Sequence, residues 1–373
     1  MKKGIYINSI FKRNRKEFET SGVGKKIASQ CKVLSKNFEM EHELHNYYKE
    51  QFTLKDKIKI RLPYTAIGEQ WKYHNKYSRF DFIYFRKDNI DYTVYKFFKQ
   101  IKRHNPACKI IFEIPTYPYD KEVCMSTKDI IFLLKDKWNR RRLRKYVDRV
   151  VTFSEDKEIW GIKTIPIYNG IDFSTISERK IKKDTSTIDV IAVANIAIWH
   201  GFDRFLEGMG QYYREGGKRS IVLHLVGDGM VVEDYKNIVD RYKIKEHVKF
   251  YGWKNAEELD EIYDSADIAL DVLGGHRKNL FLSSSLKSRE SGAKGLPIIS
   301  SCKIDYLPED YKYQLRVSQE DASIDMNDVI EFYDAVYSFE SREQVAKNIR
   351  EYAMTKCDIN KTMQPVINYI NEN

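Results

Sequence analysis

The second half of the chain alternates short β-rich runs with helical stretches, and this alternation constrains the fold more than any other feature. Apolar runs that read as buried strands occupy residues 188–194, 221–226, 248–252, 267–272 and 296–300. Helical spacing fills the intervals at 202–215, 231–242, 256–266 and 285–294. Such alternation is typical of a doubly wound parallel sheet with helices on both faces. Sheets of this kind bind ligands at the carboxyl ends of their strands.

The first half repeats the pattern less cleanly. Strands are expected at 3–8, 80–85, 109–114 and 149–154, with a helix at 24–35 and a long basic helix before the last strand. Residues 170–187 are polar and aperiodic, which indicates a boundary. The sequence therefore predicts a Rossmann-like domain at 1–180, a second one at 181–345, and a C-terminal helix at 346–373, with its return to the N-terminal domain left open.

Composition excludes several classes of protein. With 373 residues, of which 42% are hydrophobic, the chain can form two ordinary domains and is not a disordered polymer. No apolar run approaches the length of a membrane span, and the N-terminal lysines precede a short run that reads as a strand rather than a signal peptide. The five scattered cysteines favour a reducing, cytoplasmic setting. Without a D-x-D element or zinc-like spacing, no metal is expected.

Charge divides unequally between the two halves. Residues 1–183 hold 41 Lys and Arg against 22 Asp and Glu, whereas residues 184–373 hold 23 against 32, for a total of +10. A basic half suggests an anionic partner, such as a membrane surface or a diphosphate-linked lipid. Nucleic acid is not favoured, because no aromatic-interleaved basic motif is present.

Residues 129–150 read as a basic amphipathic helix that suits an anionic membrane surface at the inner face of the cell membrane. Its expected apolar side comprises Ile130, Ile131, Leu134, Trp138, Leu143 and Val147. Its expected charged side comprises Lys135, Arg140, Arg141, Arg142, Arg144 and Lys145. The alternative is a core helix with a solvated basic face.

Polar loops follow the predicted strands of the second half, where a ligand would bind. They are Asn195–Gly201, Gly227–Gly229 and residues 283–290. The last loop enters a helix, whose free N–H groups suit a diphosphate. Lys287 adds a positive charge there, and Glu290 could accept hydrogen bonds from ribose hydroxyls. The plainer alternatives are a glycine turn, an N-cap cluster of serines, a loop histidine at 200 and a solvated glutamate.

The stretch 188–301 resembles the C-terminal domain of the group-1, or family-4, retaining glycosyltransferases of the GT-B fold. The resemblance rests on VGDGMVVEDYKNIVDRYKIKEHVKFYGW, ELDEIYDSADIALDV and SLKSRESGAKGLPIISS. YNGID at 168–172 and SGVGKKIASQCKVL in the first half resemble further segments of that family. The resemblance implies two Rossmann-like domains that face a central cleft.

The resemblance also implies roles for individual residues. Glu290 matches the glutamate that binds the donor ribose, and Gly252 with Trp253 matches the turn lining the base pocket. The expected catalytic residues are Glu290, Lys287 and His200. The expected donor-binding residues are Asn195, Gly227, Gly229, Gly252, Trp253, Ser284, Ser285, Leu286 and Glu290. On the acceptor side, the resemblance and the loop EIPTYPYD indicate Gly22, Gly24, Glu113, Thr116 and Tyr117, although a rigid loop of packed tyrosines is an equal reading of the last three.

Two departures from the family pattern matter. The first glutamate of the E-x7-E pair falls at Leu282, and the two cations that neutralise the diphosphate fall at Asn195 and His200. His200 would be a cation only with a raised pKa, so Lys287 is the candidate for the missing charge.

The function implied is metal-independent, retaining transfer of a hexose from a nucleotide sugar, in the first place a UDP-sugar, which is a substrate rather than a cofactor. The acceptor would be a glycan or a polyprenyl-diphosphate-linked glycan of a capsule, exopolysaccharide or O-antigen. The alternatives are a non-catalytic GT-B-like accessory subunit and a GT-B UDP-sugar epimerase.

Overall fold

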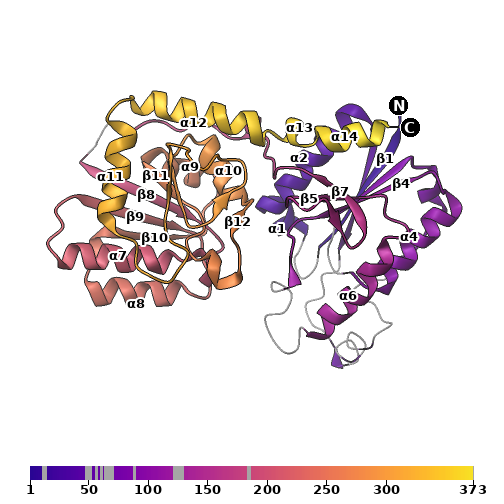
Figure 1. The fold of residues 1–373 in the computed structure, drawn as a ribbon, viewed down its shortest axis with the longest axis horizontal. Coiled ribbons are helices and arrows are strands. Elements are labelled where there is room, and N and C mark those ends of the chain that lie inside the picture. Colours follow the sequence, from indigo (N-terminus) through magenta and orange to yellow (C-terminus); the bar gives the residue numbers. More distant parts are fainter. Residues whose placement is uncertain are drawn as a thin grey trace. The chain divides into compact units, whose positions relative to one another are not determined.

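The chain folds into two α/β units in a computed structural model (Figure 1). The structure describes residues 1–10, 15–46, 53–54, 58, 62, 71–86, 90–120, 130–182 and 186–372. Unit 1 comprises Met1–Tyr168 together with Ile359–Asn373, and unit 2 comprises Asn169–Asp358. Among the described residues, no helix combines the length and apolar character needed to cross a bilayer.

Unit 1 is built on a seven-stranded sheet in the order β2-β1-β3-β4-β5-β7-β6. All its pairings are parallel except that of β6 with β7. Its strands are β1 (Lys3–Ile10), β2 (Glu39–Asn46), β3 (Phe82–Arg86), β4 (Lys109–Ile114), β5 (Arg149–Thr152), β6 (Glu158–Ile159) and β7 (Ile162–Pro166). Its helices are α1 (Arg15–Thr20), α2 (Gly22–Asn37), η1 (Asn75–Arg79), α4 (Tyr92–His104), α6 (Ile130–Leu143), α13 (Ile359–Thr362) and α14 (Gln364–Asn371).

Alternate residues of the unit 1 strands pack into different cores. Ile5 and Ile7 of β1 join the core formed with α4, whereas Tyr6 joins the core formed with α2, α13 and α14. The period of two follows from the pleat of a strand, and burial of both faces explains why these strands are apolar throughout.

The last helix of the chain, α14, packs in the same core as Tyr6 of β1. Figure 1 accordingly shows the two termini close together. Val366, Ile367 and Ile370 of α14 are buried in the unit 1 core. The ammonium group of Lys109 donates to the carbonyl of Tyr369 at 3.0 Å, and that of Lys2 donates to the carbonyl of Ile370 at 2.5 Å. Cations at the C-terminal end of a helix satisfy carbonyls that lack intrahelical partners.

Unit 2 is built on a six-stranded parallel sheet in the order β10-β9-β8-β11-β13-β15. Its strands are β8 (Thr187–Val193), β9 (Ser220–Val226), β10 (Val248–Gly252), β11 (Ile268–Leu270), β13 (Ile298–Ser300) and β15 (Gln314–Arg316), and β12 (Leu282–Ser283) pairs separately with β14 (Lys303–Ile304). Its helices are η2 (Phe173–Thr175), η3 (Ile198–His200), α7 (Phe202–Arg214), α8 (Val232–Tyr242), η4 (Lys245–His247), α9 (Ala256–Ser265), η5 (Gly275–Lys278), α10 (Leu286–Ala293), α11 (Met326–Tyr337) and α12 (Arg342–Cys357).

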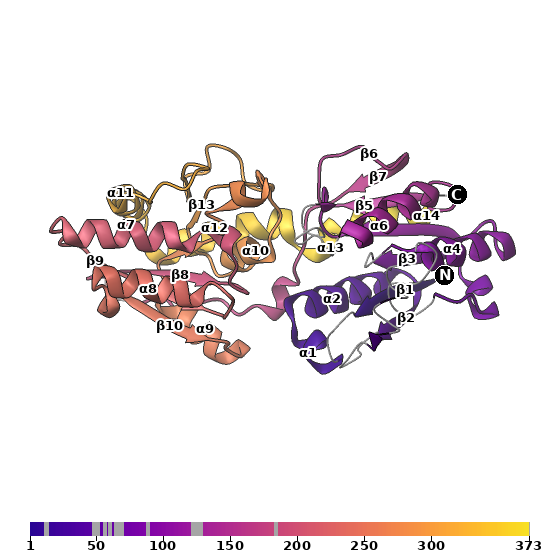
Figure 2. The same cartoon turned by 90° about the horizontal axis from the view of Figure 1, so that it is seen from below.

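Helices cover both faces of the unit 2 sheet. Helices α7 and α8 lie side by side and pack with α11 on the largest core (Figures 1 and 2), whereas α9 packs on the opposite face through Ile262 and Tyr263. The strand order runs outward in both directions from β8 and β11. In a doubly wound sheet this reversal opens a crevice beside the carboxyl ends of the two central strands.

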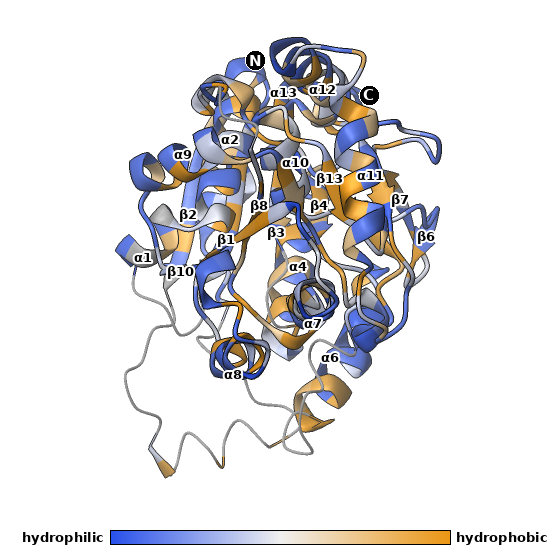
Figure 3. Ribbon diagram, turned by 90° about the vertical axis from the view of Figure 1, so that its left-hand side faces the viewer, coloured by the Kyte–Doolittle hydropathy of each residue, from blue (hydrophilic) through white to orange (hydrophobic). Residues whose placement is uncertain are grey.

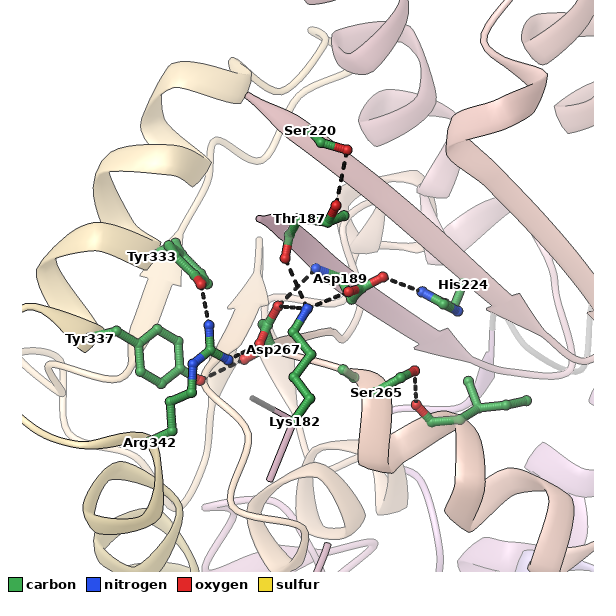
Figure 4. A network of polar contacts seen from close by, with 12 residues as sticks. Lys182, Thr187, Asp189, Ser220, His224, Ser265, Asp267, Tyr333, Tyr337 and Arg342 are labelled. Carbon is green, nitrogen blue, oxygen red and sulfur yellow. Dashed lines mark hydrogen bonds and ion pairs between the residues drawn. The ribbon is translucent and has the colours of Figure 1, made fainter. Parts of the chain in front are cut away.

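A buried polar network ties the amino ends of the central strands to the last helices of unit 2 (Figure 4). The Asp267 carboxylate is fully buried and pairs with Lys182 at 2.7 Å and with Arg342 of α12. Asp189 of β8 also binds Lys182 and accepts a hydrogen bond at 2.8 Å from His224 of β9. Each buried charge therefore has partners, which is the condition for tolerating charge in a protein interior.

The predicted fold class, a GT-B α/β arrangement of two Rossmann-like units, is confirmed. Two predicted helices are corrected. The helix expected at 129–150 ends at Leu143, and its final part instead forms a turn and then β5. The C-terminal helix expected at 346–373 is replaced by three helices that begin at Arg342, interrupted by the extended backbone of Asp358 and restarted with Pro365 in the first turn of α14.

Candidate functional site

The loops after β8 and β11 lie against each other at the crevice of the unit 2 sheet. The amide of Leu273 donates to the carbonyl of His200 at 2.8 Å. Gly201 has a positive φ of 67°, and a Cβ atom there would overlap the backbone of Gly274. Only glycine combines this conformation with so close an approach. The two loops therefore form one continuous surface at the place where a doubly wound sheet binds its ligand.

The Gly227–Gly229 turn passes directly beside the loop that follows β8. Gly227 has a φ of 113°, and a Cβ atom there would overlap the carbonyl oxygen of Ala194. A Cβ atom on Gly229 would overlap the carbonyl oxygen of Ile196, whose amide donates to the carbonyl of Asp228 at 2.7 Å. Both glycines are thus required by close backbone packing, which fixes the path of the loop that carries Asn195. Asn195 itself is exposed.

Gly252 ends β10 at the same edge of the sheet, and Trp253 follows it. Gly252 has a φ of 63°, and its carbonyl accepts a hydrogen bond of 2.8 Å from the amide of Gly227. The Trp253 side chain is 67% exposed. A large aromatic surface beside the ligand edge is available for stacking on a planar ring.

His200 is buried, and its hydrogen bonds fix its tautomer. Its Nδ1 accepts a hydrogen bond of 2.9 Å from the amide of Ala197, and its ring stacks on Phe202. Burial, with smaller contributions from the charges of Lys287 and Lys278, lowers the pKa of His200 to about 2. The imidazole is therefore neutral, with its proton on Nε2. This corrects the idea that a raised pKa makes His200 a cation, and leaves it as a neutral hydrogen-bond donor.

The N-terminus of α10 is held by the carboxylate of Asp271, which is not among the residues predicted from the sequence. Ser285 is the N-cap, and its hydroxyl accepts from the amide of Ser288 at 3.2 Å. The same hydroxyl donates to Asp271 at 2.8 Å, and the hydroxyl of Ser283 donates to Asp271 at 2.9 Å. Asp271 is fully buried at the end of β11. It therefore positions the serine segment against the sheet.

The other serine of this segment faces a second buried ion pair. The hydroxyl of Ser284 donates to Asp305 at 2.7 Å, and Asp305 pairs with the fully buried Arg289 of α10. The carbonyl of Ser284 accepts from Asn169 at 2.7 Å. Of the predicted donor contacts, Ser284 and Ser285 thus have hydroxyls engaged within the protein, so a ligand would meet their backbone. Leu286, which opens α10, is partly buried against a neighbouring core.

Two lysines bring positive charge to the same place. Lys287, in the first turn of α10, is half-buried, and desolvation lowers its pKa, an effect that Lys278 reinforces and that Asp271 and Glu290 oppose. The ammonium group of Lys278, in η5, lies 4.6 Å from the ring centre of Trp199. Both lysines act electrostatically on His200. Lys278 was missed because only the folded path of the β11 loop brings it there.

Glu290 lies one turn after Lys287 on α10 and is half-buried. It favours the charged form of Lys287, and together with burial it raises the pKa of Tyr263. Lys287 is therefore electrostatically coupled to two of the predicted residues, His200 and Glu290, and also to Lys278 and Asp271.

Arg277 braces the loop that carries His200. Its guanidinium binds Asp203 through two bonds, at 2.8 and 2.7 Å, and donates to the carbonyl of Ile198 at 2.8 Å. It also binds Asp321 at 2.7 Å, and these carboxylates raise its pKa. A bidentate arginine fixes geometry as well as charge.

The candidates in unit 1 occupy varied environments. Glu113 is fully buried, and its carboxylate accepts from Gln30 at 2.7 Å and also binds Tyr84 and Arg86. Its observed role is to pair the ends of β3 and β4, rather than to present a free carboxylate. Thr116 and Tyr117, just beyond β4, are partly exposed.

The two glycines of unit 1 lie at the start of α2. Gly22 is exposed. The amide of the buried Gly24 donates to the hydroxyl of Ser21 at 3.1 Å, and a Cβ atom on Gly24 would overlap the carbonyl oxygen of Phe18. The second glycine therefore permits the close packing of α1 against α2. Among the described residues of both units, no group of three or more His, Cys, Asp or Glu side chains is arranged to hold a metal ion.

Comparison with known proteins identifies the unit that carries this site. Residues 173–355 match the family model of the glycosyl transferases group 1. Unit 2 therefore resembles the glycosyl transferases group 1 domain over these residues. The matched range includes the loops after β8 and β11 and the whole of α10, with Lys287 and Glu290. A search of curated proteins finds no match.

Solved structures of GT-B glycosyltransferases are similar to the whole chain. A glycosyltransferase from Rickettsia africae has a TM-score of 0.65 at 10% identity, covering 100% of this chain and 99% of that one. Anabaena HepE in complex with UDP and glucose has a TM-score of 0.60 at 11% identity, with full coverage of both chains. Sucrose-phosphate synthase from Thermosynechococcus elongatus has a TM-score of 0.63 at 13% identity, covering 99% of each. These likenesses extend the GT-B fold to both units of the chain.

Proposed function

We propose that the chain is a glycosyltransferase that moves a sugar from a nucleotide sugar, in the first place a UDP-sugar, to a glycan acceptor. The observation that carries the proposal is the contact of the β8 and β11 loops through Leu273 and His200, beside the N-terminus of α10 that Asp271 holds. Lys278 and Lys287 add positive charge there, within the region that matches the group 1 model. Support for uridine comes from HepE, a structural relative solved with UDP and glucose.

The donor diphosphate is proposed to bind at the N-terminus of α10. Backbone amides there and the positive end of the helix dipole favour an anion. Lys278 and Lys287 supply two positive charges, in place of the cations that the family pattern would put at Asn195 and His200. His200 contributes a neutral N–H donor from Nε2. Glu290 would accept hydrogen bonds from the ribose, and Trp253 with Gly252 would line the base.

The chemistry proposed is retaining transfer without a metal. As the bond between the anomeric carbon and the diphosphate oxygen breaks, negative charge grows on the leaving phosphate, and the two lysines would stabilise it more strongly than in the ground state. The acceptor hydroxyl attacks from the same face, and its proton passes to the leaving phosphate oxygen. Such a route uses no separate general base.

The acceptor is proposed to be a glycan or a polyprenyl-diphosphate-linked glycan of a capsule, exopolysaccharide or O-antigen, used at the inner face of the cell membrane. Thr116 and Tyr117 of unit 1, which are partly exposed, are the polar candidates for acceptor contacts, along with the exposed Gly22. The net charge of +19 over residues 1–183 supports an anionic acceptor or surface.

The test is a panel of UDP, GDP, dTDP, ADP and CMP in a thermal-shift assay, followed by release of sugar from the matching nucleotide sugar. A nucleotide at 100 times its Kd stabilises the folded state by about 2.7 kcal/mol. Stabilisation by UDP and slow hydrolysis of a UDP-sugar support the proposal. Failure of every nucleotide to bind would favour the accessory-subunit alternative, and acceptor-independent inversion of a UDP-sugar centre would favour the epimerase.

A further inference from the structure

The first turns of α6 expose apolar side chains. Ile130, Ile131, Phe132, Leu133 and Leu134 are consecutive, and none of them is buried. Ile130 is 44% exposed and Leu134 is 60% exposed. Trp138, one turn further along the same face, is 58% exposed. Figure 3 shows the start of α6 as hydrophobic and its later turns as hydrophilic.

The side of α6 that packs on unit 1 is polar instead. Lys135, Asp136 and Asn139 are buried, and Asp136 accepts a hydrogen bond of 2.5 Å from the hydroxyl of Tyr119. Arg140 binds Asp120 at 2.7 Å, which anchors the helix to the loop after β4. Only Leu143, at the C-terminal end, joins the apolar core of the unit. The side chains that pack this helix on the unit are therefore mostly polar, whereas the apolar side chains of its first turns lie outside the apolar core.

Basic side chains surround the C-terminal part of the same helix. Arg141, Arg144 and Lys145 are exposed. The Arg142 guanidinium lies 5.0 Å from the ring centre of Trp138 and 5.5 Å from that of Tyr95. Apolar side chains at one end, a tryptophan at the junction and arginines behind it are the order in which a bilayer presents acyl chains, interface and anionic headgroups.

We infer that the first turns of α6 insert into the interface of an anionic lipid bilayer, with Arg141, Arg142, Arg144 and Lys145 bound to its headgroups. This corrects the amphipathic pattern expected from the sequence, because hydrophobic and basic residues separate along the helix axis and not around it. Charge complementarity favours a lipid surface as the partner. The exposed apolar residues at 130–134 alone would also suit a protein, but the basic residues at 141–145 that follow them suit anionic headgroups.

Vesicle flotation in the absence of nucleotide tests the inference. The intact chain should bind vesicles containing phosphatidylglycerol, bind pure phosphatidylcholine vesicles much more weakly, and lose affinity as salt is raised. Replacing Arg141 and Arg142 with Ser should lower the partition coefficient about 30-fold, since each arginine near such a surface contributes about a factor of five. The double variant Ile130→Ser/Leu134→Ser should lower it at least tenfold.

Matched controls lie on unit 2. Phe339→Ser removes an apolar side chain that is 93% exposed, and Lys347→Ser removes an exposed cation, and neither should change vesicle binding. Because Ile130 and Leu134 are exposed, their double variant should keep the wild-type melting curve. Unchanged vesicle binding in Ile130→Ser/Leu134→Ser would overturn the inference. It would also be overturned if the intact chain self-associates, and this double variant abolishes the self-association but still binds vesicles. The result is separate from the proposed function, because donor binding is measured without lipid.

Discussion

The hydroxyl of Ser285 donates a 2.8 Å hydrogen bond to the buried carboxylate of Asp271. This bond joins the N-cap of α10 to the end of β11, on opposite sides of the loop that carries Lys278. The orientation of α10 toward the crevice therefore depends on a residue that need not touch a ligand.

Asp271→Ala should weaken both stability and nucleotide binding. It leaves the hydroxyls of Ser283 and Ser285 without their acceptor and removes a negative charge that favours the cationic form of Lys287. Unpaired buried polar groups cost about 1–3 kcal/mol each. Urea unfolding and UDP titration measure the two effects. If stability falls while UDP affinity is unchanged, Asp271 supports the fold alone and does not position the site.

Gly227→Ala should be strongly destabilising, whereas Gly216→Ala should be mild. Both glycines have positive φ, but a Cβ atom would overlap the carbonyl of Ala194 at position 227 and would meet nothing within 4 Å at position 216. The backbone penalty alone is about 1–2 kcal/mol, so any excess at 227 reports the close approach of the two loops. Equal melting temperatures for the two variants would mean that these loops are not in contact.

His200 should make stability depend on acidity. Its folded pKa is lowered to about 2, well below the value of about 6.5 expected in the unfolded chain. As the pH falls below about 6.5, His200 is protonated in the unfolded chain but not in the folded chain. The contribution of His200 to the free energy of unfolding is therefore fully present above this pH and is lost progressively with acidification. The slope is about 1.4 kcal/mol per pH unit, or about 2 kcal/mol between pH 6.5 and pH 5.

The comparison that isolates this effect uses His200→Gln, which lacks the titrating ring. Urea unfolding at pH 7 and pH 5 should show a smaller loss of stability for the variant than for the wild type. Between pH 6 and pH 8 the terminal phosphate of UDP itself titrates, so the pH dependence of UDP binding should be the same in the wild type and in His200→Gln, because His200 stays neutral throughout. A binding transition centred near pH 6.5 that disappears in His200→Gln would contradict the neutral assignment.

Asp267→Ala should cost about 3–5 kcal/mol, because it removes the fully buried carboxylate that Lys182 and Arg342 share. Arg342 then has no carboxylate partner in this network, and Lys182 keeps only Asp189. An exposed pair serves as the control: Glu351→Ala, which removes the partner of Lys347, should change the free energy of unfolding by less than about 1 kcal/mol. Chemical denaturation of both variants gives the comparison. Similar small losses would show that the network in Figure 4 adds little to the stability of unit 2.

The strands of unit 2 could be predicted because their signal is local. Residues 188–194, 221–226 and 248–252 are apolar runs bounded by polar turns, and β8, β9 and β10 occupy them to within about one residue. The helix at 129–150 was extended too far because its basic residues continue past Leu143 without a proline or glycine to end it.

The candidate site was predictable only in part. Glu290 and Lys287 follow from the pattern at the start of α10, and Asp271 left a faint signal as a carboxylate at the end of an apolar run. Lys278 left none, because its position depends on how the β11 loop folds back beside Trp199. The neutrality of His200 likewise depends on burial, which a loop sequence does not reveal.

Calorimetric titration of UDP and of uridine into the wild type and Lys278→Ala/Lys287→Ala tests whether the two lysines hold the donor diphosphate, with Lys347→Ala as the control. The double variant should bind UDP at least about 100-fold more weakly, since each charged hydrogen-bond partner contributes about 1.5–3 kcal/mol and about 1.4 kcal/mol corresponds to a factor of ten. Its weak affinity for uridine, and the UDP affinity of Lys347→Ala, should match the wild type. If the double variant binds UDP as tightly as the wild type, the lysines do not hold the donor diphosphate and the site assigned to unit 2 is wrong.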